Sequence, residues 1–85
     1  MEHTEGMLLT EFDKSVKTFI QENWEEINKP LIGGMMLMSF IGNLKQGWLS
    51  ASDDVLRELR VDRDTYEGMV ERITQKVMDT YMKFG

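Results

Sequence analysis

The chain has 85 residues, a formal net charge of −5 and no cysteine. This length fits one small domain, and its core is marginal because so short a chain buries only about 60–65% of its unfolded surface. The lack of cysteine excludes disulfides, thiolate metal ligands and a thiol nucleophile. The acidic balance opposes binding to nucleic acids and to anionic membranes. Self-association, or docking on a partner, is therefore the remaining way to stabilise so small a core.

The N-terminal segment, residues 1–7, is predicted to be a flexible lead ahead of a single helical domain over residues 8–85. It carries Glu2 and Glu5 where a signal peptide needs basic residues, so we expect a cytoplasmic protein. His3 is the only histidine, which excludes a multi-histidine metal site. No partner is set for it by local spacing, and we interpret it as a surface residue.

A first helix is predicted to start near Thr10, because Thr10 and Asp13 have the spacing of a capping box. Asn28, Lys29 and Pro30 end this helix, since the residue before a proline avoids the α region. We expect Trp24 to lie in the core. Apolar residues recur at steps of three and four along one face, namely Leu8, Leu9, Phe12, Val16, Phe19, Ile20, Trp24 and Ile27.

The stretch from Leu31 to Gly42 is apolar on every side, carries no charge and is rich in methionine and glycine. An amphipathic surface helix would show a polar stripe here, so this segment must be covered on most of its faces. Pro30 suits the first position of a second helix, or Gly33 and Gly34 form a turn and the helix starts at Met35. We favour a helix from Met35 to about Trp48. The apolar run is about a dozen residues, whereas a membrane span needs roughly 20.

A third helix is predicted over residues 53–60, with Ser50 or Ser52 as its cap. A fourth helix is predicted over residues 64–83, with Asp64 as its cap. Its apolar face comprises Tyr66, Met69, Val70, Ile73, Val77, Met78, Tyr81 and Phe84.

Residues 53–70 have the order and spacing of a helix-turn-helix motif, which predicts DNA binding as an alternative function. Acidic residues such as Asp62 and Asp64 would then face the major groove, where they repel phosphate. The basic residues that would offset this repulsion repeat at three-residue steps, and they are Arg57, Arg60 and Arg63.

The sequence does not favour catalysis. No Gly-x-Ser-x-Gly elbow surrounds a serine, and no Walker loop or dinucleotide fingerprint is present. Glu22 and Glu26 share a helical surface with Glu25 nearby, but they lack the Glu-x-x-His companion of helical di-iron sites, so we interpret them as a solvated acidic face. We therefore expect no enzyme, no cofactor and no metal.

These patterns predict an all-α fold, a small bundle of about four helices around a central apolar helix, and a dimer. Three amphipathic helices cannot wrap a helix that is apolar all round. We therefore expect an isologous homodimer through residues 35–48, with Gly42 and Gly34 letting two backbones approach. The residues expected at this contact are Met35, Met36, Met38, Phe40, Ile41, Leu44 and Trp48.

The function we expect is binding to protein. The chain holds eight methionines, a residue that adapts to irregular surfaces and to different partners. In size, acidity and lack of catalytic residues the chain resembles small accessory proteins of bacteria and their phages. We expect a protein that self-associates and modulates a larger partner as a regulator or inhibitor. Binding to nucleic acid and to membranes is not expected.

Overall fold

The computed structural model describes residues 2–81, and the side chains of residues 4–81. The described part of the chain is all-α, as predicted, and contains no strand. Its five helices are α1 (Glu2–Glu22), α2 (Trp24–Ile27), α3 (Ile32–Leu49), α4 (Asp53–Leu59) and α5 (Arg63–Tyr81).

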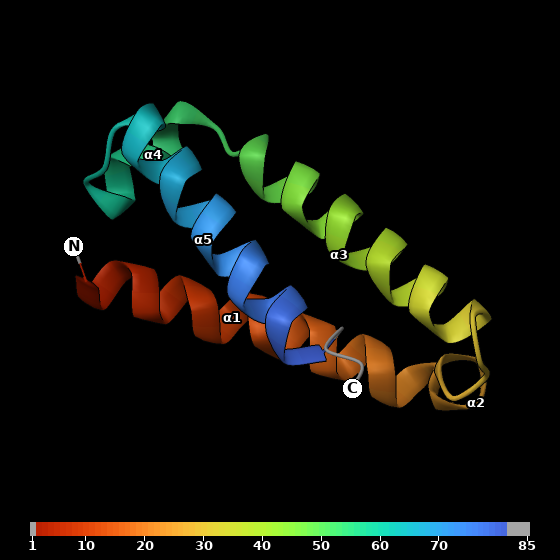
Figure 1. Cartoon of the computed structure of the whole chain (residues 1–85). Helices are drawn as coiled ribbons and strands as arrows, with labels where there is room; N and C mark the ends of the chain where they lie inside the picture. Colours follow the sequence, from red (N-terminus) through yellow and green to blue (C-terminus); the bar gives the residue numbers. More distant parts are fainter. Residues whose placement is uncertain (1, 82–85) are drawn as a thin grey trace.

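The two long helices α1 and α3 run in opposite directions along the molecule and are joined at one end by the single turn of α2 (Figure 1). The short helix α4 lies at the opposite end, and α5 returns from it to pack on both α1 and α3. The molecule is elongated, with extents of 41 × 23 × 17 Å.

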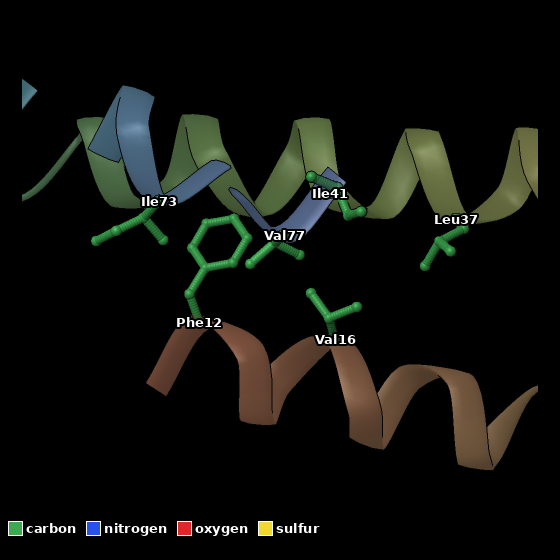
Figure 2. Packing of buried hydrophobic residues seen from close by; sticks show 6 residues of the cluster. All are labelled: Phe12, Val16, Leu37, Ile41, Ile73 and Val77. Carbon is green, nitrogen blue, oxygen red and sulfur yellow. The ribbon is translucent and has the colours of Figure 1, made fainter. Parts of the chain in front are cut away.

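The main core forms where α1, α3 and α5 meet. Each of these helices contributes two fully or nearly fully buried residues four positions apart, which places both on one face of the helix. Their side chains point toward one another between the three ribbons (Figure 2). The six residues are Phe12, Val16, Leu37, Ile41, Ile73 and Val77.

A second cluster joins α4 to the first half of α5. Leu56 packs there with Tyr66 and Val70. The predicted capping by serine is confirmed for Ser52, whose hydroxyl accepts a hydrogen bond from the backbone N–H of Val55 at 3.4 Å. The Tyr66 hydroxyl donates to the carbonyl of Trp48 at 2.8 Å and so ties α5 to the end of α3.

The start of α1 differs from the prediction. The helix begins at Glu2 instead of near Thr10, so residues 2–7, where we predicted a lead, lie in α1. Thr10 does not cap, because its hydroxyl donates to the carbonyl of Gly6 inside the helix at 3.0 Å. The first turns of α1 are tied to α5 by Glu5, whose carboxylate accepts from both Nε and Nη2 of Arg72.

The cap of α5 also differs. The helix begins at Arg63, and the carboxylate of Asp62, not that of Asp64, accepts the backbone N–H of Thr65 at 3.2 Å. Hydrogen bonds from the side chain and from the backbone N–H of Thr65 lower the pKa of Asp62 below its usual value. The predicted end of the helix near Lys83, together with Phe84, lies outside the described residues.

Trp24 was expected in the core, and this is wrong because its side chain is 57% exposed. The reason lies in the break after α1. The side-chain amide of Asn23 donates to the carbonyl of Phe19 at 2.9 Å, and the separate turn α2 starts at Trp24. The face periodicity of α1 therefore does not continue through Trp24.

The most deeply buried helix is α5, and not the apolar helix α3. Six residues of α5 are buried, compared with Gly33, Leu37 and Ile41 on α3. Helix α3 also contacts α1 and α5, and α2 at its start, but its side with Met35, Met38 and Gly42 is left exposed.

Candidate interaction surface

The inner side of α3 holds most of the residues that we predicted at an interface. Ile41 is buried in the main core, and Phe40, Leu44 and Trp48 pack against that core while partly exposed. Phe40 stacks on Phe19 of α1 with ring centroids 4.1 Å apart. The ring of Trp48 lies edge-on to Phe12 at 5.2 Å. These four residues therefore hold the chain itself together.

The outer side of α3 carries the remaining apolar surface. Leu31 is 84% exposed, and the exposed fractions are 50% for Ile32, 73% for Met35 and 54% for Met38. Met36, the other predicted interface methionine, is partly buried. We use the name "outer face" for the exposed, uncharged residues along this side of α3, which are Leu31, Ile32, Met35, Met38, Ser39, Gly42, Asn43 and Gln46.

The beginning of α3 is strained. The helix starts at Ile32, close to the alternative in which it directly follows Pro30 and before the favoured start at Met35, and Leu31 precedes it at φ 68° and ψ −55°. The N–H of Ile32 donates to the carbonyl of Pro30 at 2.7 Å. This is a γ-turn with positive φ, a rare and strained conformation. A leucine thus stands, almost fully exposed, in a backbone conformation that favours glycine.

The glycines of α3 fall into two groups. A Cβ on Gly33 would collide with the carbonyl oxygen of Ile27, so Gly33 is needed where α2 meets α3. A Cβ on Gly34, Gly42 or Gly47 would meet nothing within 4 Å. A helical glycine costs roughly 1 kcal/mol relative to alanine, and packing within the chain does not explain these three.

Two open hollows lie on either side of the exposed Met35. One has a volume of about 520 Å³ and lies toward α1, where Phe19 and Phe40 form part of its wall. The other has a volume of about 650 Å³ and is walled by Ile27 and Tyr81 among others. Met35 lines both, so its side chain stands as a ridge between two apolar hollows.

The outer face is also electrically neutral. Residues 30–44 include no ionisable side chain. Lys45, the only charged residue of α3, forms an ion pair with Glu71 of α5 at 2.8 Å and is largely covered. The acidic residues Glu22, Glu25 and Glu26 are exposed on α1 and α2, outside the outer face.

The structure shows the contacts and conformation of the three arginines of the alternative DNA-binding motif. Arg63 donates to the carbonyl of Ala51 at 2.9 Å and to Asp53 at 2.8 Å, so its guanidinium closes the loop between α3 and α4. Arg57 pairs with Asp54 at 3.3 Å on the surface. Arg60 is exposed and ends α4 in the left-handed conformation at φ 60°.

Within the described residues, no helix is long and apolar enough to cross a membrane. No group of three or more potential metal-binding side chains gathers in the part of the chain that was described. A comparison with protein-family models, with curated proteins and with solved structures found no match.

The sequence reasoning missed Leu31 and Ile32 as surface residues because the whole apolar run was treated as one unit. The polar residues Asn43 and Gln46 mark the outer side at the end of α3. Steps of three and four residues back from them reach Ser39, Met35 and Ile32. This spacing distinguishes the exposed side of α3 from its buried side.

Proposed function

We propose that this protein is a non-catalytic, cytoplasmic binding protein that uses the outer face of α3 to contact protein and to modulate a larger partner. The observation that carries the proposal is the cluster of four exposed apolar side chains at the start of α3, led by Leu31 at 84% exposure. Contiguous exposed apolar surface marks interaction sites in proteins of this size.

The strain at Leu31 supports the same proposal. A residue held at positive φ in a γ-turn costs of order 1–3 kcal/mol, and such strain gathers at functional positions. Glycine or asparagine would relieve it and would also serve better ahead of a helix. Retaining leucine sacrifices stability and displays a large apolar side chain, which suits burial against a partner.

The two exposed methionines make the outer face adaptable in shape. Met35 and Met38 are unbranched and flexible, so they can adapt to partners of irregular shape. Each large apolar side chain that becomes fully buried contributes about 1.5–3 kcal/mol. Burial of these two together with Leu31 and Ile32 contributes favourably to the free energy of binding.

The helix-turn-helix alternative has no observation in its favour beyond the order of its helices. Arg63 is engaged with the chain's own carbonyl groups, and Asp62 and Asp64 stand at the start of α5. It remains a hypothesis, and a titration of random duplex DNA at rising salt concentration tests it, because phosphate contacts weaken as salt rises.

The binding function is tested by variants that leave the fold intact. Leu31→Asn is expected to raise thermal stability by relieving strain and to weaken binding, a combination that unfolding cannot produce. Met35→Gln is compared with Met7→Gln, which makes the same change at an exposed methionine of α1.

The measurement is affinity capture from extracts of the native host, quantified by mass spectrometry. We expect a defined set of proteins to be lost with Leu31→Asn and Met35→Gln and retained with Met7→Gln. Identical recovery by all four chains would overturn the proposal.

A further inference from the structure

We infer that one occupant of the outer face is a second copy of this chain, bound so that the two α3 helices run antiparallel and Met35 of each copy covers Gly42 of the other. This inference rests on the proposed function and names a partner for the same surface. It also moves the contact away from the inward-facing Ile41, Leu44 and Trp48.

The exposed area of the chain fits such a contact. Its accessible surface is 5999 Å², whereas a compact monomer of this mass exposes about 5,200 Å². The excess accompanies the elongated shape of the molecule, and it is similar in size to the roughly 800 Å² that each partner buries in a standard interface. The radius of gyration, 13.9 Å, also exceeds the value of about 12 Å expected for a globular domain of this length.

Charge makes the outer face the surface through which two copies can meet with the least repulsion. Each chain carries a net charge of −5, so two copies repel each other, and this repulsion is smallest where neutral surfaces meet. The outer face of α3 is neutral over residues 30–44, and α1, α4 and α5 all carry exposed acidic residues. A basic partner would be drawn to those acidic surfaces, whereas the outer face offers it no attraction.

The shape of the outer face is complementary to itself. Met35 and Gly42 are seven residues apart, which places them on the same side of α3 two turns from each other. One is a ridge that stands between two hollows, and the other leaves open space where a side chain would be. A two-fold axis between Met38 and Ser39 sets each Met35 over the opposite Gly42, and the contact is then isologous.

This register also gives the glycine a purpose. The absence of a Cβ at Gly42 lets the opposing helix approach and leaves a depression for the Met35 side chain. The helical cost of glycine, roughly 1 kcal/mol, is then offset by contact between the copies.

Engineered cysteines test the register directly, because the natural chain has none. We expect an oxidised mixture of Met35→Cys and Gly42→Cys chains to give mainly the mixed disulfide dimer. In this register two identical cysteines on opposite copies are about 10.5 Å apart along the helix, beyond the reach of about 7 Å of a disulfide. Gly47→Cys, a matched glycine position on another side of α3, is expected not to cross-link with Met35→Cys.

The oligomeric state of the full chain is the second measurement. Sedimentation equilibrium is expected to give twice the chain mass at high micromolar concentration. Gly42→Leu is expected to weaken the dimer by about tenfold or more, because it fills the depression that receives the opposite Met35, while Gly47→Leu leaves it unchanged. Circular dichroism verifies that both variants remain helical.

The outcomes separate this inference from the proposed function. A monomer at high micromolar concentration overturns the inference that a second copy binds the outer face. Preferential cross-linking of Met35→Cys to itself also overturns it, because this result indicates parallel helices. A chain that is monomeric and floats with phospholipid vesicles likewise overturns the inference, because this result assigns the outer face to lipid. Host proteins captured through Leu31 and Met35 would support the proposed function in each of these cases.

Discussion

Gly33 lies so close to Ile27 that a Cβ atom on the glycine would collide with the isoleucine carbonyl oxygen. The chain thus reverses direction between α2 and α3 with two backbones in direct contact. The side chain of Ile27 packs on the main core from the same turn. The position of α3 relative to α1 depends on this contact, and so does the placement of the outer face.

Replacement of Gly33 tests that contact. We expect Gly33→Ala to destabilise the fold by about 1–3 kcal/mol, as overpacking against backbone does. Gly47→Ala has open space around it and is expected to stabilise by up to about 1 kcal/mol through helix propensity. Urea denaturation of both variants measures the difference. A Gly33→Ala chain as stable as Gly47→Ala would contradict the close approach.

The two tryptophans are expected to respond differently to truncation. Trp48→Ala removes a ring that lies 5.2 Å from Phe12, and we expect a loss of about 3 kcal/mol. Trp24→Ala removes an exposed ring and is expected to change stability by less than about 0.5 kcal/mol. Thermal denaturation followed by circular dichroism compares the two. Equal losses would show that Trp24 is packed as the sequence suggested.

The hydrogen bond from Tyr81 to Asp13 is expected to make stability depend on alkaline pH. The two oxygens are 2.7 Å apart. Burial, the hydrogen bond and the negative charge of Asp13 raise the pKa of Tyr81 to about 12. Because this pKa is raised on folding, the neutral phenol stabilises the fold fully below the ordinary value of about 10, and the contribution is lost as pH rises toward 12.

The variant Tyr81→Phe lacks this contribution. We expect it to be less stable than the natural chain by about 1 kcal/mol at neutral pH. The gap should close between about pH 10 and pH 12, where the natural chain alone loses the bond. Urea midpoints measured for both chains across this range give the difference. A gap that stays constant with pH would show that the bond does not form in solution.

The buried hydroxyl of Thr74 gives a way to stabilise the fold. Its oxygen is inaccessible to solvent and has no hydrogen-bond partner among the described residues. An unsatisfied buried polar group costs about 1–3 kcal/mol. We expect Thr74→Val to raise the free energy of unfolding by about 1 kcal/mol.

The matched control for this change is Thr80→Val on the same helix. Thr80 is exposed, and its hydroxyl donates to the carbonyl of Lys76 at 2.9 Å, so no gain is expected. Denaturant titration of both variants provides the comparison. A loss of stability with Thr74→Val would indicate that the hydroxyl has a partner in solution.

Salt is expected to strengthen the proposed dimer. Two chains of net charge −5 repel at low ionic strength, and added salt screens that repulsion. The dissociation constant should therefore fall a few fold as sodium chloride is raised toward physiological ionic strength. Chloride is preferred to sulfate, because sulfate strengthens apolar burial on its own. A dimer that weakens with salt would depend on ion pairs, contrary to the neutral outer face.

Much of the helical organisation could be predicted from periodicity and local signals. The steps from Phe12 to Val16 and from Ile73 to Val77 place core residues correctly, and Ser52 caps α4. The errors occur where one local hydrogen bond forms in place of another. The cap of α5 is Asp62, two residues before the predicted Asp64. Thr10 bonds inside α1, and the break at Asn23 turns Trp24 outward.

The candidate site was harder to predict because hydrophobicity does not specify which side of a helix is covered. Leu37 and Leu31 are the same residue type within the same run, and one is buried while the other is almost fully exposed. The difference arises from where α1 and α5 happen to lie. The γ-turn at Leu31 has no local signature, since leucine is disfavoured at positive φ.

The two ends of α3 are held very differently. The last turn of α3 is held by hydrogen bonds from side chains of α5. The Tyr66 hydroxyl donates to the carbonyl of Trp48, and Arg63 donates to the carbonyl of Ala51 just beyond the helix. At its first turn the helix rests on a strained reversal without a side-chain cap. Amide protons near Ile32 should therefore exchange with solvent sooner than those near Trp48, and fraying of α3 would begin at the end that displays the methionines.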